Sequence, residues 1–286
     1  MKITIKMLKD YQSFLLDEEK ASATVEKYMR DIMAFMKWAN NRKLDKQTVL
    51  SYKEYLMDKH TAASVNSVIS SLNSFFSYME WYFLRVKTIK VQRRIFANKD
   101  KELTREEYTR LLQTAKNKGN RRLFMLMQTI CSVGLRVSEV QYITVEAVKN
   151  ETAVIRCKGK MRQVFLPSDL CRMLSKYIKE ENIKSGAVFI TKNGKPLDRS
   201  NIWSDMKALC KEAGVSREKV FPHNLRHLFA RTYYSIQKDI VRLADILGHS
   251  SVNTTRIYTM ETGEIHRQQI QRLGLLLCGY KNNHII

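Results

Sequence analysis

The stretch PHNLRHLFARTYYSIQKDIVRLADILGHSSVNTTRIY, residues 222–258, holds the most informative set of side chains in the chain. It begins with a His-x-x-Arg pair, His223 and Arg226, and it ends in Tyr258, nine residues after His249. Gly248 is a helix C-cap signal, so His249 is expected at a corner between two helices. A phenol with a pKa of about 10 is a weak nucleophile until cations or a base favour its phenolate. The stretch therefore predicts a helical segment that gathers imidazoles and a guanidinium around one tyrosine.

The charge of the chain indicates what such a tyrosine would attack. Fifty Lys and Arg residues stand against 28 Asp and Glu, a formal net charge of +22. This balance is typical of a protein that binds a polyanion, so a phosphodiester is the expected electrophile. A ribosomal protein, a membrane-surface protein or a merely solvated basic surface would share the same charge. Hydrophobic content of 44% and charged content of 27% indicate a globular protein, and 286 residues suffice for two domains.

The cysteines and the first 20 residues indicate the cellular compartment in which the protein is expected. The five cysteines form no C-x-x-C pair, so we expect reduced thiols, not disulfides or zinc ligands. Charged residues interrupt every apolar run in residues 1–20, which argues against a signal peptide. No run of 18 apolar residues occurs, so we expect a soluble, cytoplasmic protein that does not enter a membrane.

The first third of the chain predicts a helical domain at residues 1–84, followed by a basic linker at residues 85–100. Apolar residues recur at helical spacing over residues 25–36 and 65–79, with shorter helices expected near residues 11–16 and 49–56. Neither Gly nor Pro occurs in residues 1–100. The periodicity ends after residue 84, and the segment that follows is rich in Lys and Arg. Such a linker would either lie along a phosphate backbone or act as a solvated tether.

The remainder, residues 101–286, predicts a second domain that combines helices with a small antiparallel sheet. Thr104 and Glu107 form a capping-box pattern, and residues 121–133 read as a buried helix. Residues 153–157 and 163–166 are strand-like around a Lys-Gly-Lys turn, which predicts a hairpin. Residues 187–190 are a candidate third strand, and helices return from Ser200 onward. The expected fold class is mainly α with a small antiparallel sheet.

Cleavage of a phosphodiester also needs cations that balance charge and a proton donor for the leaving oxygen. Arg136 follows an apolar helix, and Glu139, three residues along, could orient it; a purely structural Arg–Glu pair is the alternative. Lys158 stands at the hairpin turn, where it is either a mobile general acid or an ordinary polar turn residue. His223 and His227 have an i, i+4 spacing that suits zinc. Since Asn224 stands where a metalloprotease motif has Glu, we expect no metal there.

Taken together, these motifs resemble the tyrosine recombinase (phage integrase) family, in particular its two-domain Xer-like or transposon-encoded members. The matching stretches are Gly134-Leu135-Arg136-Val137-Ser138-Glu139, Lys158-Gly159-Lys160-Met161-Arg162, His223-Asn224-Leu225-Arg226-His227, and Leu247-Gly248-His249-Ser250-Ser251 through Thr254-Thr255-Arg256-Ile257-Tyr258. Their order covers the whole second domain. The resemblance implies an N-terminal SAM-like core-binding domain followed by an α/β catalytic domain.

The resemblance also implies roles for six residues. Tyr258 would be the nucleophile that forms a 3′-phosphotyrosyl link, with Arg136 and Arg226 clamping the scissile phosphate. His223 would accept the tyrosine proton or bond the phosphate, and His249 would add a phosphate contact. Lys158 would protonate the leaving oxygen, although Lys160 stays open because the hairpin is one residue shorter than the family pattern. The family requires no metal or other cofactor.

The implied partner is double-stranded DNA with specific core sites, exchanged through a Holliday junction by a homotetramer. The apolar residues Ile270, Leu273 and Leu277 share one face of a C-terminal helix that would pass to a neighbouring subunit; packing on its own domain is the alternative. The implied function is integration, excision or resolution of a mobile element or replicon dimer, and accessory proteins are possible. A type IB topoisomerase-like enzyme and a catalytically lapsed DNA-binding protein are the rival interpretations.

Overall fold

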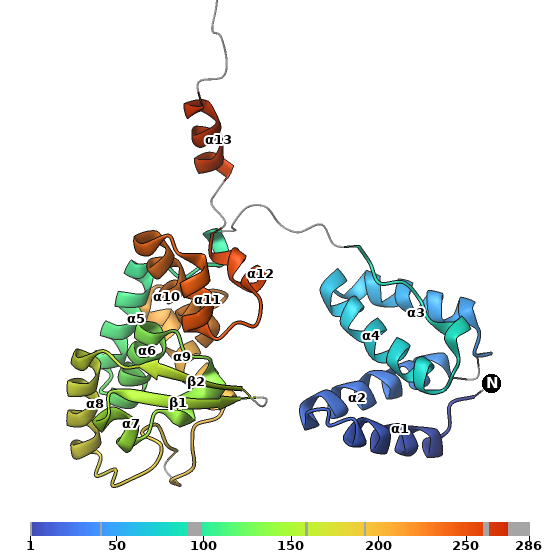
Figure 1. Ribbon diagram of the computed structural model, residues 1–286, viewed down its shortest axis with the longest axis horizontal. Helices are drawn as coiled ribbons and strands as arrows, with labels where there is room; N and C mark the ends of the chain where they lie inside the picture. The colour runs from blue at the N-terminus through green and yellow to red at the C-terminus, as the bar shows by residue number, and fades with distance from the viewer. Residues whose placement is uncertain are drawn as a thin grey trace, which may run out of the picture. The chain divides into compact units, whose positions relative to one another are not determined.

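The computed structural model describes residues 2–40, 42–90, 99–157, 160–191, 193–259 and 263–273. The chain divides into two compact units, an N-terminal unit (Met1–Arg93) and a C-terminal unit (Arg94–Ile286) (Figure 1). Within the described ranges, no helix combines the length and the apolar character needed to cross a membrane. Cys131, Cys171 and Cys210 are free thiols, whereas the side chain of Cys157 and all of Cys278 lie outside the description.

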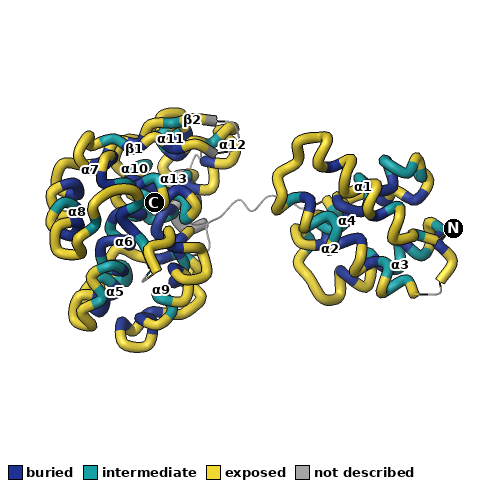
Figure 2. Tube along the Cα trace, turned by 90° about the horizontal axis from the view of Figure 1, so that it is seen from below, coloured by how far each residue is buried: buried dark blue, intermediate teal, exposed yellow. Residues whose placement is uncertain are grey.

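The N-terminal unit is a helical bundle. It consists of α1 (Ile5–Asp17), α2 (Ser22–Ala39), α3 (Lys46–Lys59), α4 (Ala62–Tyr78) and the short 3₁₀ turn η1 (Tyr82–Leu84). Side-chain oxygens of Thr4, Asp45 and Thr61 accept hydrogen bonds from backbone N–H groups in the first turns of α1, α3 and α4, which fixes where these helices begin. The predicted apolar stripes face one core, in which Phe35, Phe75 and neighbouring aliphatic side chains are fully buried. Figure 2 marks the buried stretches of these helices along the chain.

Residues 85–90, the first part of the expected linker, lie against α4. The Asn73 side chain exchanges hydrogen bonds with the backbone of Val86 at 2.8 and 3.0 Å. Asn66 does the same with Ile89 at 2.9 and 2.7 Å. Val86 is buried in the core of the N-terminal unit, so this part of the basic segment is packed and hydrogen-bonded. Residues 91–98 of the expected linker lie outside the described residues.

The C-terminal unit surrounds a two-stranded sheet with helices. In chain order it contains η2 (Lys99–Lys101), α5 (Arg105–Asn117), α6 (Arg121–Val133), η3 (Val137–Tyr142), α7 (Val145–Lys149), β1 (Thr152–Cys157), β2 (Lys160–Phe165), α8 (Ser168–Glu180), α9 (Arg199–Ala213), α10 (Pro222–Gln237), α11 (Ile240–Leu247), α12 (Val252–Thr255), η4 (Arg256–Tyr258) and α13 (Gly263–Arg272). The capping box at Thr104 and the buried helix at residues 121–133 are both present. Helix α6 packs against α5, α8 and α10 and forms the centre of the core.

The hairpin prediction is confirmed, but the third strand is wrong. β1 and β2 pair antiparallel, with Cys157 opposite Lys160, and Ala153 and Ile155 point into the core. Within the described chain, residues 187–190 make only isolated bridges, from Ala187 to Thr144 and from Ile190 to Pro196. Pro196 has no N–H to continue a ladder, and Gly186 adopts a positive φ of 77° directly before the segment. The apolar run is instead buried as an irregular connection, in which Val188 and Phe189 are fully covered.

Candidate active site

The C-terminal end of α6 determines the position of Arg136. Gly134 caps that helix in the left-handed conformation, with φ 66° and ψ 36°, and turns the chain toward η3. An added Cβ at Gly134 would lie 2.5 Å from Cδ1 of Phe229, so both the backbone angle and the available space require glycine. The residues after this turn bring Arg136 to the start of η3, where its side chain is 36% exposed.

Glu139 holds the guanidinium of Arg136, as the spacing suggested. Arg136 Nη1 donates to Glu139 Oε1 at 2.7 Å, and the Arg136 backbone N–H donates to Oε2 at 2.8 Å. Burial alone would raise the pKa of Glu139, but the backbone hydrogen bond and the charges of Arg162 and Arg136 outweigh it, and the net shift is downward. Glu139 is therefore a buried carboxylate kept ionised by arginines.

Arg226 is the most completely buried cation of the site. It lies on the first turns of α10, is 1% exposed, and donates from Nη1 to the Gly134 carbonyl at 2.6 Å and from Nη2 to the Leu247 carbonyl at 2.7 Å. Burial and the charge of Arg136 lower the pKa of Arg226 to about 10. Its Nη1 also lies 3.8 Å from Glu139 Oε2. Arg226 thus joins the end of α6 to the end of α11.

His249 lies at the corner after α11, where Gly248 is left-handed with φ 62°. Arg226 Nη2 lies 3.0 Å from His249 Nε2, and His249 Nδ1 lies 2.8 Å from the hydroxyl of the fully buried Thr255. Because a guanidinium only donates, Nε2 must accept, which leaves the proton on Nδ1 for Thr255. Burial and the charges of Arg226, Arg136 and Arg162 lower the pKa of His249 to about 4, in agreement with this neutral tautomer.

Tyr258 ends the short turn η4 and is only 5% exposed. Its ring is stacked on His249, with ring centroids 6.3 Å apart and an interplanar angle of 13°. Burial raises the pKa of Tyr258, while the charges of Arg226 and Arg136 oppose this increase. The structure therefore places the phenol beside the two predicted arginines.

His223, the first residue of the His-x-x-Arg pair, is more exposed than Arg226 and Tyr258. Partial desolvation and the charges of Arg226, Arg136 and Arg199 lower its pKa. Lys158 lies outside the described residues, and the side chain of Lys160 is likewise not described. Five of the six predicted site residues are thus brought together, and the position of the sixth stays a prediction.

Two residues belong to this cluster that the sequence did not assign to it. Arg162, on β2, donates from Nη2 to Glu139 Oε2 at 2.6 Å and from Nη1 to the carbonyl of Ile246. It therefore ties the hairpin to both η3 and α11. Thr255 orients His249, as described above. Arg162 could have been recognised from its place in the Lys-Gly-Lys-Met-Arg motif, whereas no local pattern distinguishes Thr255 from Thr254.

The cluster opens onto two hollows that share Arg136 and Ser138. One, of about 710 Å³, is lined by Arg162, Gly248 and His249 on the hairpin side. The other, of about 670 Å³, is lined by His223, Arg199 and Trp203 on the side of α9 and α10. Arg136 is thus accessible from both sides, as a group that binds an extended polyanion must be.

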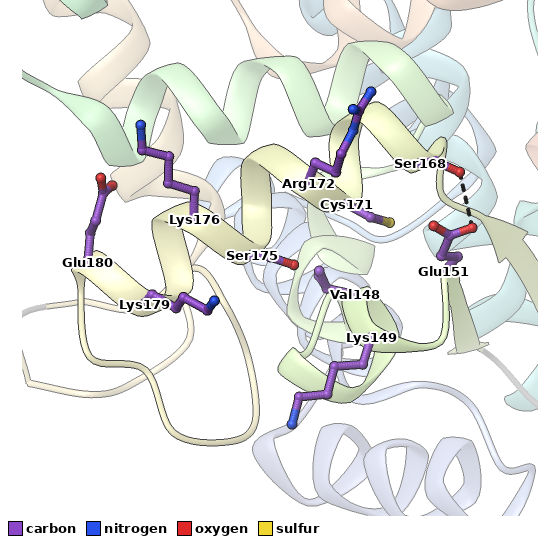
Figure 3. Close-up of a pocket in the computed structure, with 10 residues that line it drawn as sticks. All are labelled: Val148, Lys149, Glu151, Ser168, Cys171, Arg172, Ser175, Lys176, Lys179 and Glu180. Atoms are coloured by element: carbon purple, nitrogen blue, oxygen red, sulfur yellow. Dashed lines mark hydrogen bonds between the residues drawn. The ribbon is translucent and has the colours of Figure 1, made fainter.

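A separate hollow of about 700 Å³ lies between α7 and α8 (Figure 3). Its rim carries Lys149, Arg172, Lys176 and Lys179, and the Glu151 carboxylate at one end accepts a hydrogen bond from Ser168 at 3.2 Å. None of the six predicted site residues lines it. Among the described residues, no group of three or more His, Cys, Asp or Glu side chains is arranged to hold a metal ion, and His223 and His227 have no such third partner.

Comparisons with known proteins identify the family to which the chain belongs. Residues 101–264 match the phage integrase family, and residues 8–82 match the phage integrase N-terminal SAM-like domain. The chain belongs to this family and is a tyrosine recombinase. It is 27% identical over 282 residues to the tyrosine recombinase XerA of Pyrococcus furiosus, covering 95% of each chain.

Solved structures share the fold. The XerH site-specific recombinase bound to a palindromic difH substrate in a post-cleavage complex superposes with a TM-score of 0.73 at 21% identity, over 87% of this chain and 79% of that one. A lambda integrase tetramer bound to a Holliday junction superposes with a TM-score of 0.72 at 18% identity, over 90% of this chain and 77% of that one. The SAM-like and catalytic folds expected from the sequence are confirmed.

Proposed function

We propose that this protein is a site-specific DNA recombinase that cleaves and rejoins strands through a covalent bond between Tyr258 and a 3′ phosphate. The observation that carries the proposal is the position of the buried Tyr258, whose ring is stacked on His249, the imidazole that accepts a hydrogen bond from the buried Arg226. A fixed guanidinium near a tyrosine favours the phenolate, which makes the phenol reactive toward a phosphodiester.

In the proposed cleavage, the Tyr258 oxygen attacks phosphorus, the bond from phosphorus to the 5′ oxygen breaks, and the phenolic proton passes to His223. Arg136 and Arg226 balance the charge that develops on the non-bridging oxygens, because their guanidinium forks stay protonated. The 5′ oxygen takes a proton from Lys158, with Lys160 as the alternative donor. A 5′-hydroxyl from a second strand reverses these steps, and two rounds pass through a Holliday junction.

The terminal guanidinium nitrogens of both arginines donate hydrogen bonds within the protein. Arg226 donates to two backbone carbonyls and to His249, and Arg136 Nη2 donates to the Gly248 carbonyl at 3.2 Å. A phosphate offers stronger acceptors than these carbonyls because it is charged. We infer that the scissile phosphate displaces the His249 and Gly248 contacts and that His249, once released, turns to bond the phosphate.

The partner is double-stranded DNA with a specific core site, and the working assembly is a homotetramer. A contribution from the C-terminal helix is supported by the exposure of Ile270 (56%) and Leu273 (63%) on the chain that follows Tyr258; Leu277 lies outside the described residues. The domain limits that we propose are residues 1–84, 85–100 and 101–286, with residues 85–90 of the middle segment packed on the first domain. Integration, excision and resolution of a mobile element or replicon dimer all fit this chemistry, as does a cytoplasmic location with or without accessory proteins. We propose no cofactor.

The decisive test is a suicide substrate, a nicked duplex that carries the protein's own site, recovered from random-sequence duplexes by repeated binding. We expect a covalent adduct at the 3′ phosphate that is absent in Tyr258→Phe. An equal adduct in the variant would overturn the assignment of the nucleophile. Relaxation of supercoiled DNA without any junction product would favour the topoisomerase-like interpretation, and DNA binding without adduct in the unmodified protein would favour the lapsed enzyme.

The same assay separates the two lysines. A substrate with a 5′-bridging sulfur has a leaving group that needs no proton. We expect this substrate to restore cleavage by Lys158→Ala. Restoration in Lys160→Ala instead would move the general acid to that residue.

A further inference from the structure

His227 occupies a place in the site that the proposed mechanism does not use. It follows Arg226 on α10, and its ring contacts two rings that the mechanism does use. The centroid of the His227 ring is 4.4 Å from that of His223 at an interplanar angle of 68°, and 5.1 Å from that of Tyr258 at 83°. Both contacts are edge-to-face, the geometry in which the positive edge of one ring meets the negative face of another. The His227 ring therefore packs against both the proposed base and the proposed nucleophile.

The hydrogen bonding of His227 indicates what its ring contributes to the site. Its Nε2 atom is buried and has no hydrogen-bond partner among the described residues. An unpaired buried nitrogen is uncommon and destabilising, so it calls for an explanation. Because no hydrogen bond orients the ring through Nε2, the contacts of His227 with His223 and Tyr258 are packing contacts. The contribution of His227 here comes from shape.

The surrounding charges keep this ring neutral. Arg226 and His223 lie beside it on α10, Tyr258 lies on η4, and His249 lies at the corner after α11. Burial, followed by the proximity of His223, Arg226 and His249, lowers the pKa of His227 to about 4. A cationic ring at this position would repel the guanidinium that binds the phosphate. The His227 ring thus adds no charge to the site at neutral pH.

The contacts around Tyr258 leave its ring little freedom. The His249 ring runs nearly parallel to that of Tyr258, at 13° with centroids 6.3 Å apart, and His227 meets the Tyr258 ring at 83°. A stacked neighbour alone lets the tyrosine ring slide in its own plane, whereas a second, perpendicular ring blocks that motion. Two imidazoles therefore pack against the Tyr258 ring from different directions.

We propose that His227 is a positioning residue of the cleavage reaction: its ring, packed against both His223 and Tyr258, sets the direction of the attacking oxygen. This inference rests on the proposed role of Tyr258 as nucleophile. It concerns a residue to which the mechanism above gives no part.

Two substitutions separate the ring from its nitrogens. His227→Phe keeps an aromatic ring of similar shape and removes the unpaired Nε2, whereas His227→Ala removes the ring. The control is Tyr234→Ala, which deletes a partly buried ring on the same helix and in the same apolar cluster. The readouts are the single-turnover rate of adduct formation on the suicide duplex, the Kd for that duplex, and the melting temperature.

We expect His227→Ala to slow adduct formation by about a hundredfold while Kd changes by less than about twofold, because misplacement by a fraction of a bond length lowers the rate far more than binding. His227→Phe should retain the rate within about threefold and melt at a higher temperature, since it buries no unpaired nitrogen. Tyr234→Ala should lower the melting temperature and leave the rate intact. A normal rate in His227→Ala, or equal losses in His227→Ala and His227→Phe, would overturn the proposal.

A second readout does not depend on catalysis. Labelling with 3-fluorotyrosine gives each tyrosine a ¹⁹F resonance, and Tyr258→Phe identifies the one from Tyr258. We expect His227→Ala to shift or broaden that resonance, and we expect His227→Phe and Tyr234→Ala to keep it narrow. An unchanged Tyr258 signal in His227→Ala would refute the positioning role even if adduct formation showed that Tyr258 is not the nucleophile, so the two proposals fail separately.

Discussion

Glu139 binds Arg136 twice, through the guanidinium at 2.7 Å and through the backbone N–H at 2.8 Å, and only 1% of its side chain is exposed. The same carboxylate accepts from Arg162 Nη2 at 2.6 Å. One buried acid thus fixes the predicted clamp residue of η3 and the arginine that anchors the hairpin. Removing one member of such a buried network leaves the remaining charges uncompensated.

Glu139→Gln should therefore destabilise the protein by about 3–5 kcal/mol and reduce cleavage more than DNA binding. Because the net pKa of Glu139 is lowered, the stabilisation from its charge is complete above the unfolded-state pKa of about 4.3 and is lost as pH falls through the lower folded pKa. Urea unfolding at neutral and acid pH measures both effects. The exposed Glu181→Gln is the control, and equal stabilities for the two variants would contradict the network.

The histidines of the site should make stability depend on pH in the mildly acidic range. The pKa of His249 and that of His227 are both lowered to about 4, whereas an unfolded histidine titrates at about 6.5. Between these values the unfolded chain binds more protons, so stability is complete above about pH 6.5 and declines as pH falls toward about 4. We expect the urea midpoint to drop over this window, and we expect a shallower decline in His249→Gln. A parallel decline in wild type and variant would argue against burial of a neutral His249.

Local patterns predicted the helices and the hairpin because their signals are local. The helix at residues 121–133, the capping box at Thr104 and the C-cap at Gly248 depend on residues only a few positions apart. The prediction of a third strand was wrong because a short apolar run is compatible with any buried segment. The surrounding residues determine whether such a run forms a strand. Its neighbours, Gly186 and Pro196, do not support a ladder.

The residues of the site were predictable from the sequence, but the hydrogen bonds and ion pairs that connect them were not. Motif order named Arg136, His223, Arg226, His249 and Tyr258, and the fold brings these side chains together. The contacts of Arg226 with the carbonyls of Gly134 and Leu247 span 92 and 21 residues, and no sequence spacing predicts them. Arg162 reaches Glu139 across 23 residues for the same reason.

Gly134 offers a test of how closely the chain is packed where its carbonyl accepts from Arg226. Gly134 and Gly214 both cap helices in the left-handed conformation, with φ of 66° and 60°. A Cβ at Gly214 meets nothing within 4 Å, whereas one at Gly134 would lie 2.5 Å from Phe229. We expect Gly214→Ala to cost roughly 1 kcal/mol from backbone strain, and Gly134→Ala to cost about 1–3 kcal/mol more from overpacking. The free energy of unfolding in urea measures both, and equal losses would show that Phe229 yields freely. Cleavage should fall only in Gly134→Ala, since the Gly134 carbonyl accepts from Arg226.

Asn224 provides the last test, because it attaches α10 to the chain that enters the C-terminal unit. Its side chain is 3% exposed, and Nδ2 donates to the carbonyls of Lys101 at 2.9 Å and Lys219 at 2.7 Å. Asn224→Asp replaces the donor with a carboxylate oxygen that faces two acceptors, so we expect a loss of about 2–4 kcal/mol and slower cleavage through displacement of the adjacent His223. The exposed Asn117→Asp is the matched control, because its oxygen only accepts from Gln113. If Asn224→Asp unfolds at the same urea concentration as Asn117→Asp, this amide does not fasten α10 to the entering chain.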